Sequence, residues 1–133
     1  MKYVMIILVL LATDPLKVRR INSTKAEARD AFQSGNYQAA VEKYNVLIDS
    51  MGVAEDELVL NRAHAYYLLK DTAHALSDYQ SLLQSSKNEI VSRAGNQLGL
   101  MSNHKNKPEE ALSYFKQAVK ADPSNDDARY NYE

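Results

Sequence analysis

The side chains that could do acid–base or metal chemistry are few and widely spaced in this 133-residue chain. It has no cysteine, which removes disulfides, thiolate metal sites and a cysteine nucleophile. The three histidines, His64, His74 and His104, form no His-x-x-x-His or Glu-x-x-His pair of the kind that binds zinc. We therefore predict no metal site and no cofactor, and we interpret the histidines as polar surface side chains.

The carboxylates give no support for catalysis either. Glu109–Glu110 and Asp126–Asp127 are adjacent pairs that fit the first turn of a helix, where the helix dipole stabilises negative charge. The run from Asp122 to Asp127 offers oxygen ligands, but it lacks the spacing and the downstream glutamate of a calcium loop. Glycine motifs that cradle phosphates or expose a serine nucleophile are also missing. The sequence therefore predicts a protein that is not an enzyme.

Composition and charge narrow the class of protein further. The net charge is -1 and the pI is near 6.3, whereas a nucleic-acid-binding surface is expected to carry a strong basic excess. Glycine (4) and proline (3) are scarce, which favours helices over turn-rich β structure. The length suits one domain, which would bury roughly two-thirds of the surface of the unfolded chain.

A short pattern occurs three times and determines the expected fold. A small residue is followed four residues later by an aromatic one, at Ala40 and Tyr44, Ala75 and Tyr79, and Ala111 and Phe115. Successive copies stand 35 and 36 residues apart, a period typical of stacked supersecondary units. On a helix, residues four apart share one face, so each alanine admits a neighbouring helix and the aromatic ring fills the remaining gap. We expect the units to stack, because one hairpin cannot bury both of its faces.

Each unit is predicted to contain two helices joined by a tight turn. In the second unit, apolar residues fall at helical spacing over 58–69, Lys70–Asp71 forms the turn, and a second helix runs from about 72 to 84. After the third unit, residues 122–125 break the chain and a final helix begins over 126–133.

Two further helix starts are predicted from local signals. Thr24-x-x-Glu27 resembles a capping box, which would begin the first helix of unit one and lead to about Ser34. Pro108 suits the first turn of the second helix of unit three, because proline lacks the N–H group that would be unpaired there.

Together the units resemble the tetratricopeptide-repeat (TPR) family, whose pattern is W-x2-L-G-x2-Y, then A-x3-F, then P. The matching residues are Ala28, Ala40 and Tyr44 in unit one, Ala63, Tyr66, Ala75 and Tyr79 in unit two, and Leu98, Gly99, Ala111, Phe115 and Pro123 in unit three. The tryptophan place departs from the pattern, with Thr24, Val59 and Gly95. The resemblance implies an all-α, right-handed superhelical solenoid of about three helix-turn-helix repeats, over 22–54, 56–89 and 92–125, plus a C-terminal capping helix over 126–133.

In that family the first helices of successive hairpins line a concave groove. The resemblance places a candidate peptide-binding set there: Lys25, Arg29, Asn61, His64, Tyr67, Leu68, Arg93, Asn96, Gln97 and Leu100. This mixture of cations, amides and apolar side chains suits an extended peptide, which needs amide partners for its backbone and cations for its acids.

Three interpretations of the groove cations remain open. Some TPR domains hold a C-terminal carboxylate with a clamp of Lys, Asn, Asn, Lys and Arg. Lys25 and Asn61 match two of those places and Arg93 stands in for a lysine, but Arg29 and Gln97 depart from the pattern. The groove would then hold a partial clamp, or be basic in a general way, or its cations would be solvated helix charges.

The N-terminal segment differs from the repeats. Lys2 precedes an apolar run, Val4–Ala12, which is shorter than the roughly 20 residues that a membrane-spanning helix needs. The layout is that of a secretory signal with a cleavage site at Leu10-x-Ala12. The alternative is an apolar helix that packs on the first repeat.

Three cations, Lys17, Arg19 and Arg20, follow the apolar run and argue against export, because positive charges tend to stay cytoplasmic. We assign residues 1–21 to a signal-like apolar segment with a basic linker, and residues 22–133 to the repeat domain. A weaker resemblance, to the exported TPR components of aerotolerance operons in Bacteroides-type bacteria, implies an exported, periplasmic or membrane-associated protein; the alternative is a cytoplasmic one.

The resemblance implies a non-catalytic adaptor or scaffold that binds a protein or peptide partner, one that is acidic or offers a C-terminal carboxylate, and no nucleic acid. The alternative is a structural assembly subunit that associates through its end or its convex face, and the partner complex could be membrane-associated. Tyr130 and Tyr132 on the final helix would then form an adhesive end for self-association.

Overall fold

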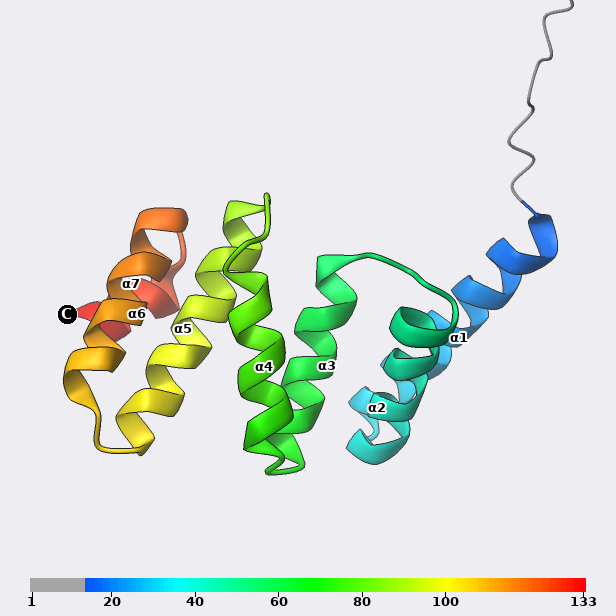
Figure 1. The fold of residues 1–133 in the computed structure, drawn as a ribbon, viewed down its shortest axis with the longest axis horizontal. Coiled ribbons are helices and arrows are strands. Elements are labelled where there is room, and N and C mark those ends of the chain that lie inside the picture. Colours follow the sequence, from blue (N-terminus) through cyan, green and yellow to red (C-terminus); the bar gives the residue numbers. More distant parts are fainter. Residues whose placement is uncertain (1–13) are drawn as a thin grey trace, which may run out of the picture.

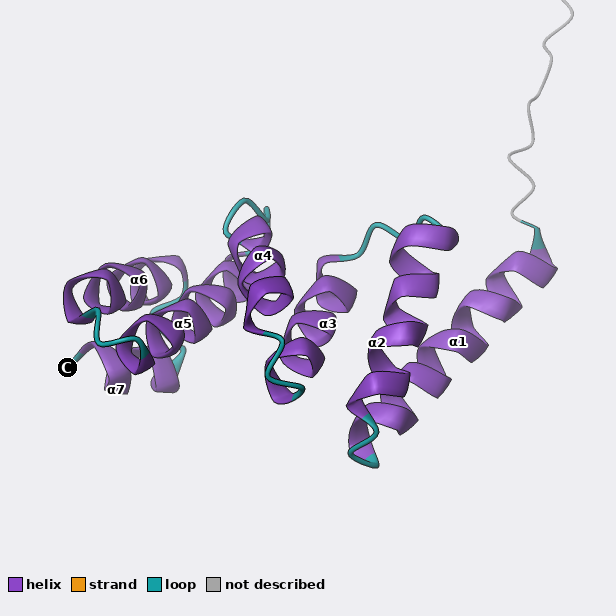
Figure 2. Ribbon diagram, turned by 60° about the horizontal axis from the view of Figure 1, so that its bottom comes forward, coloured by secondary structure: helices purple, strands orange, loops and turns teal. Residues whose placement is uncertain are grey.

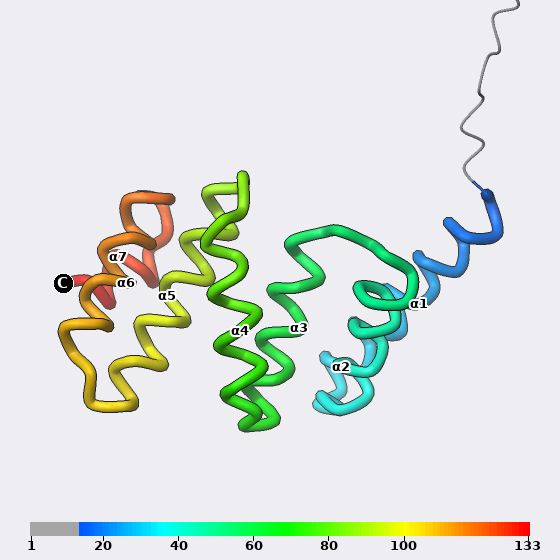
Figure 3. Tube along the Cα trace, viewed as in Figure 1, coloured from blue at the N-terminus to red at the C-terminus, as the bar shows by residue number. Residues whose placement is uncertain are grey.

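The computed structural model describes residues 14–133, and within that range every regular element is a helix (Figure 1). The elements are α1 (Pro15–Gln33), α2 (Tyr37–Asn45), the short π-helical turn η1 (Val46–Ser50), α3 (Asp56–Leu68), α4 (Thr72–Leu82), α5 (Asn88–His104), α6 (Pro108–Ala121) and α7 (Asp126–Tyr132). They form three antiparallel hairpins, α1/α2, α3/α4 and α5/α6, and α7 packs on the last of them (Figure 3). The all-α repeat fold is confirmed.

Equivalent turns close the three hairpins. Gly35, Lys70 and Asn106 follow the first helix of each hairpin, and each has a positive φ of 78°, 63° and 56°, respectively. Glycine and asparagine tolerate this left-handed conformation, whereas Lys70 adopts it at a cost. In the first two turns the next helix starts at a side-chain cap: Asn36 accepts a hydrogen bond from the Ala39 N–H and Asp71 accepts one from the His74 N–H. The predicted turn at Lys70–Asp71 is confirmed.

The core consists of two apolar clusters, one across α1, α2 and α3 and the other across α3, α4 and α5. The aromatic residues of the repeated pattern, Tyr44, Tyr79 and Phe115, are buried as predicted. Tyr66 is half-buried and packs against both clusters, so it links the first hairpin to the second. This continuous packing makes the first helix of each hairpin a rigid support for its exposed side chains.

The first helix begins earlier than predicted. α1 starts at Pro15, with Asp14 as its N-cap accepting a hydrogen bond from the Leu16 N–H, so the predicted capping box is wrong. Thr24 lies inside the helix and donates its hydroxyl to the Arg20 carbonyl, one turn earlier. The predicted basic linker is therefore helical from Pro15 onward. The apolar run Val4–Ala12 lies outside the described residues.

Candidate functional site

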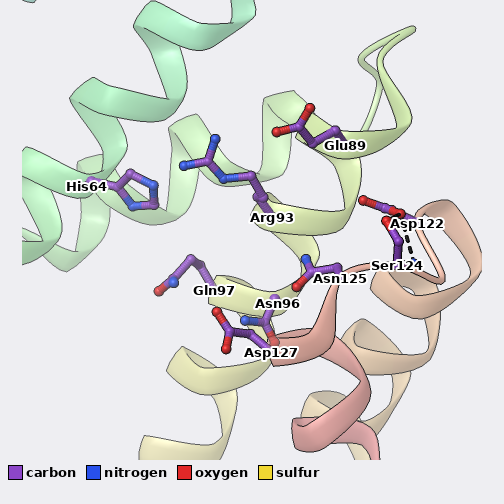
Figure 4. Close-up of a pocket in the computed structure, with 9 residues that line it drawn as sticks. All are labelled: His64, Glu89, Arg93, Asn96, Gln97, Asp122, Ser124, Asn125 and Asp127. Carbon is purple, nitrogen blue, oxygen red and sulfur yellow. Dashed lines mark hydrogen bonds between the residues drawn. The ribbon is translucent and has the colours of Figure 1, made fainter.

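The candidate site is an open pocket of about 510 Å³ on the side of the molecule where α3, α5 and α7 follow one another (Figure 4). We call it the α3–α5–α7 groove. Its lining residues are His64 from α3, Glu89, Arg93, Asn96 and Gln97 from α5, Asp122, Ser124 and Asn125 from the α6–α7 connection, and Asp127 from α7. Four of the ten predicted peptide-binding residues thus meet in one place: His64, Arg93, Asn96 and Gln97.

Arg93 is the cation at the centre of this groove. Its side chain extends from α5 between Glu89 and Gln97, and His64 faces it from α3 (Figure 4). Arg93 is exposed and forms no ion pair with any other residue in the range 14–133. A guanidinium held on a rigid helix and left unpaired is well suited to accept a carboxylate from a partner.

His64 is a structural member of the groove, which corrects its interpretation as a surface side chain. The ring is partly buried, and its Nδ1 lies 2.5 Å from the Tyr79 hydroxyl of α4. Burial, assisted by the positive charge of Arg93, lowers the pKa of His64 to about 4. The ring is therefore neutral near pH 7, so its Nδ1 can accept a hydrogen bond from the Tyr79 hydroxyl.

Carboxylates give this end of the groove a mixed charge. Glu89, Asp122 and Asp127 share the lining with Arg93. Asp122 is engaged locally, since its Oδ1 accepts hydrogen bonds from the backbone N–H and the hydroxyl of Ser124. The groove is therefore not uniformly basic, and a partner placed there meets both signs of charge.

Amide side chains fasten α7 to the floor of the groove. Asn131 of α7 donates its side-chain amide to the Asn96 side-chain oxygen at 2.8 Å, and Asn125 donates to the Ser92 hydroxyl at 2.9 Å. Asn96 is buried with 6% of its surface exposed, so this predicted binding residue is committed to holding the capping helix. The sequence shows that these residues are polar, but it does not show that they form hydrogen bonds with residues about 35 positions away in the chain.

The other predicted binding residues lie outside this pocket. The Lys25 ammonium forms an ion pair with Glu55 at 2.7 Å, and Tyr67 packs against the core with its hydroxyl 3.4 Å from His104. Arg29 is exposed on α1, and Asn61 and Leu100 are partly buried. Leu68 is 46% exposed. The pocket thus contains Arg93 and Gln97 of the candidate clamp without Lys25 and Asn61.

Sequence reasoning missed Arg62, whose guanidinium joins three elements. It binds both oxygens of Asp78 at 2.8 Å, the Asn45 side-chain oxygen at 3.0 Å and the Asp49 carboxylate at 3.4 Å. Hydrogen bonding to Asp78 raises the pKa of Arg62 further. Because only 14% and 12% of the Arg62 and Asp78 side chains are exposed, the pair is part of the interior. In the sequence, the only indication of this buried role is that Arg62 stands among apolar residues at helical spacing.

Comparison with known families identifies the repeats. Tetratricopeptide-repeat models match residues 25–90 and residues 93–125, which together span most of the chain. The chain belongs to the TPR family. Its three hairpins are TPR units, in which α1, α3 and α5 are the first helices, and this placement agrees with the resemblance noted from the sequence.

Solved TPR domains have the same fold. The second TPR domain of human RPAP3, in complex with the HSP70 peptide SGPTIEEVD, is 25% identical, with a TM-score of 0.71 over 87% of this chain and 94% of that one. The first TPR of Spaghetti (RPAP3), bound to the HSP90 peptide SRMEEVD, is 24% identical with a TM-score of 0.72, over 86% of this chain and 88% of that one. An Arabidopsis OM64 TPR domain is 21% identical with a TM-score of 0.72, covering 87% and 93%. The latter two likenesses concern the fold alone.

Curated relatives are longer proteins. The chain is 36% identical over 73 residues to a DnaJ homolog subfamily C member 7 homolog from Schizosaccharomyces pombe, a stretch that is 50% of this chain. It is 26% identical over 122 residues, or 81% of this chain, to the inactive peptidyl-prolyl cis-trans isomerase shutdown from Bombyx mori. The matches span 15% and 28% of the lengths of these relatives, so they concern a module within each of them.

In the part of the chain from residue 14 onward, no helix combines the length and apolar character that crossing a bilayer requires. Within the same residues, no three His, Asp or Glu side chains gather in a way that could hold a metal ion.

Proposed function

We propose that this TPR module binds an extended segment of a partner protein along the α3–α5–α7 groove, with Arg93 as the anchor for a partner carboxylate. The observation that carries the proposal is the unpaired Arg93 guanidinium in an open, polar pocket that also presents Gln97 and His64. Amide and cationic side chains on rigid helices can pair with the backbone and the acids of a peptide.

The charges in the groove favour one kind of segment. A carboxylate near Arg93 gains a charge-assisted hydrogen bond, whereas a run of acids would also approach Glu89, Asp122 and Asp127. We therefore expect a segment with a single well-placed acid, such as a C-terminal carboxylate, followed or preceded by neutral or basic residues. The HSP70 peptide in complex with the similar RPAP3 domain, SGPTIEEVD, carries several acids at its end. It therefore tests whether additional acids weaken binding to this groove.

The test is a fluorescence-anisotropy titration with two labelled peptides, SGPTIEEVD and a variant in which the two glutamates are glutamines. We expect both to bind and the glutamine variant to bind more tightly. Arg93→Gln should weaken binding of the glutamine variant by roughly 10- to 100-fold, because the bond to a charged group contributes about 1.5–3 kcal/mol. Lys120→Gln, which removes an exposed cation of α6 outside the pocket, is the matched control and should leave binding unchanged. Equal affinity of the wild type and Arg93→Gln would refute the anchor.

A second candidate function, assembly through the C-terminal end, is favoured by exposed apolar side chains. Tyr130 is 82% exposed, Tyr132 is 40% exposed and Leu112 on α6 is 52% exposed. A surface of this kind is suited to another subunit. Light scattering that shows concentration-dependent association, unchanged in Arg93→Gln, would support assembly over peptide capture.

The location of the protein stays a prediction. The signal-like run lies in residues 1–13, outside the described part, and the relatives named above lend no support to the aerotolerance resemblance or to a periplasmic setting. We retain an exported or membrane-associated location as a proposal, with a cytoplasmic one as its alternative.

A further inference from the structure

We propose that the first turns of α1 dock onto a membrane surface that carries anionic phospholipids. This surface is distant from the α3–α5–α7 groove, and the proposal does not depend on what the groove binds. It rests on the described residues 14–20 and on the composition of the chain that precedes them.

The start of α1 projects from the body of the solenoid. α1 has 19 residues, and its hairpin partner α2 is continued by η1 as far as Ser50; in both ribbon views the N-terminal part of α1 diverges from this second arm (Figures 1 and 2). All residues from Asp14 to Arg20 are exposed. The first inward-facing residues, Ile21 and Thr24, come later. This segment is therefore free to lie against a large flat surface without displacing any core contact.

Three cations on this segment have no partner within the described chain. Lys17, Arg19 and Arg20 appear in no ion pair of residues 14–133, and residues 1–13 contain no aspartate or glutamate that could supply one. Of the later cations of the same hairpin, Lys25 pairs with Glu55 and Lys43 pairs with Glu27, whereas the exposed Arg29 forms no ion pair within residues 14–133. The one acid nearby, Asp14, caps the helix.

The position of these cations on the helix strengthens the inference. Positive charge near a helix N-terminus opposes the helix dipole, and the N-cap Asp14 is the one acidic side chain at this end of α1 that offsets it. Such an arrangement costs free energy in isolation. An anionic surface placed against the start of α1 lowers this cost, because its phosphates pair with the cations.

Apolar side chains interleave with the cations, which selects a lipid bilayer among anionic partners. Leu16 is 75% exposed and Val18 is 45% exposed. The apolar sequence Val4–Ala12 ends two residues before Asp14. Stable attachment to a membrane generally takes two signals, such as an apolar anchor and a basic cluster, and both occur here next to each other in the chain.

The test is co-sedimentation of the full chain with two kinds of vesicle, pure phosphatidylcholine and phosphatidylcholine with roughly a third phosphatidylglycerol. We expect binding to the anionic vesicles that weakens as salt is raised through the physiological range. The triple variant Lys17→Glu/Arg19→Glu/Arg20→Glu should lose binding by more than about 100-fold, because each basic residue near such a surface contributes about fivefold.

A matched control carries the same change of charge at the other end of the molecule. Lys105, Lys116 and Lys120 are exposed residues of α6 and the turn before it, and reversing all three should leave vesicle binding within a few-fold of wild type, with folding of both variants checked by circular dichroism. Equal binding to neutral and anionic vesicles, or an equal loss in both triple variants, would overturn the proposal. Because these assays omit the groove peptide, their failure would leave the proposed groove function untouched.

Discussion

The second and third hairpins have the same backbone plan but fill equivalent positions with opposite chemistry. In α3/α4, Arg62 pairs with Asp78, and in α5/α6 the residues 36 positions later are Leu98 and Tyr114, which belong to the apolar packing. His64 and Tyr79 are hydrogen-bonded, whereas the matching residues of α5/α6 are Leu100 and Phe115.

The first hairpin supplies a third version of the same position. Glu27 and Lys43, 35 residues before Arg62 and Asp78, form an ion pair with the charges exchanged. About half of each of those side chains is exposed, whereas the Arg62–Asp78 pair is nearly enclosed. The three hairpins thus fill this pair of positions with an ion pair of either orientation or with apolar side chains. What differs is the cost of breaking each pair, which depends on burial.

The largest expected effect comes from breaking the enclosed pair. Asp78→Ala leaves the Arg62 guanidinium partly buried without its bidentate partner, and we expect a loss of about 3 kcal/mol in the free energy of unfolding, measured by urea denaturation. Glu27→Ala at the equivalent exposed pair should cost far less, because solvent screens an exposed ion pair.

A double substitution sharpens this prediction. Arg62→Leu/Asp78→Tyr installs the apolar pair of α5/α6 in α3/α4, and it should recover most of the loss because a well-packed apolar pair often replaces a buried ion pair at little cost. A double variant that is as unstable as Asp78→Ala would show that the two hairpins are not interchangeable at this position. The contacts of Arg62 with Asn45 and Asp49 of the first hairpin would then be the first place to look for the reason.

The second prediction concerns the pH dependence that the α3/α4 hairpin gains from His64. Its pKa is about 4 in the folded protein, against 6.5 for an ordinary histidine. The unfolded chain therefore takes up a proton below about pH 6.5 that the folded protein refuses, so stability is full above that pH and is lost as the pH falls toward 4. We expect His64 to account for a loss of about 1–2 kcal/mol between about pH 7 and pH 5, allowing for its partial exposure.

His64→Leu tests this by installing the residue of the α5/α6 hairpin. Urea unfolding at the two pH values should show that the variant loses much less stability than the wild type. Four carboxylates have a lowered pKa in the folded protein: Glu27, Glu57, Asp71 and Glu110. The stability that they contribute is lost only as the pH falls below their ordinary pKa values near 4, so they interfere little between pH 7 and pH 5. An unchanged pH dependence in the variant would assign the effect to another group.

The smallest expected effect tests how closely the helices of α5/α6 approach. A methyl group added at Gly99 would lie 2.3 Å from Cε1 of the Phe115 ring, closer than any real contact, so the ring must move. Overpacking typically costs 1–3 kcal/mol, and the better helix propensity of alanine returns up to about 1 kcal/mol. We expect Gly99→Ala to lower the free energy of unfolding by about 1 kcal/mol. Gly99→Ala/Phe115→Leu should then be less unstable than the sum of its two single changes.

Much of the fold was accessible from sequence for identifiable reasons. The 35- and 36-residue spacing of Ala40, Ala75 and Ala111 predicted the stacked hairpins, and all three alanines are buried. The start of α1 was missed even though Asp14–Pro15 is itself a good signal, an N-cap followed by proline in the first turn. The cations Lys17, Arg19 and Arg20 favoured a linker instead. A helix that exposes every side of its first turns shows no apolar periodicity, so the sequence gives no helical pattern there.

The candidate site was accessible only in part. The family pattern placed His64, Arg93, Asn96 and Gln97 on first helices, and these do meet in one groove. The sequence did not indicate that the acids Asp122 and Asp127 would join them, since that depends on how the final connection and α7 fold back on α5.

Sequence alone determined the elements, their order and the residues that pack, because helical spacing and a fixed period are local properties of the chain. Only the tertiary structure decided which charges are available. Lys25, Lys43 and Arg62 are neutralised by acids from other elements, while Arg93 and the cations at the start of α1 are left without an acidic partner in the part of the chain that the structure describes. The physical reason is that an ion pair needs two groups within about 4 Å, and the chain brings distant residues to that distance only when its hairpins stack.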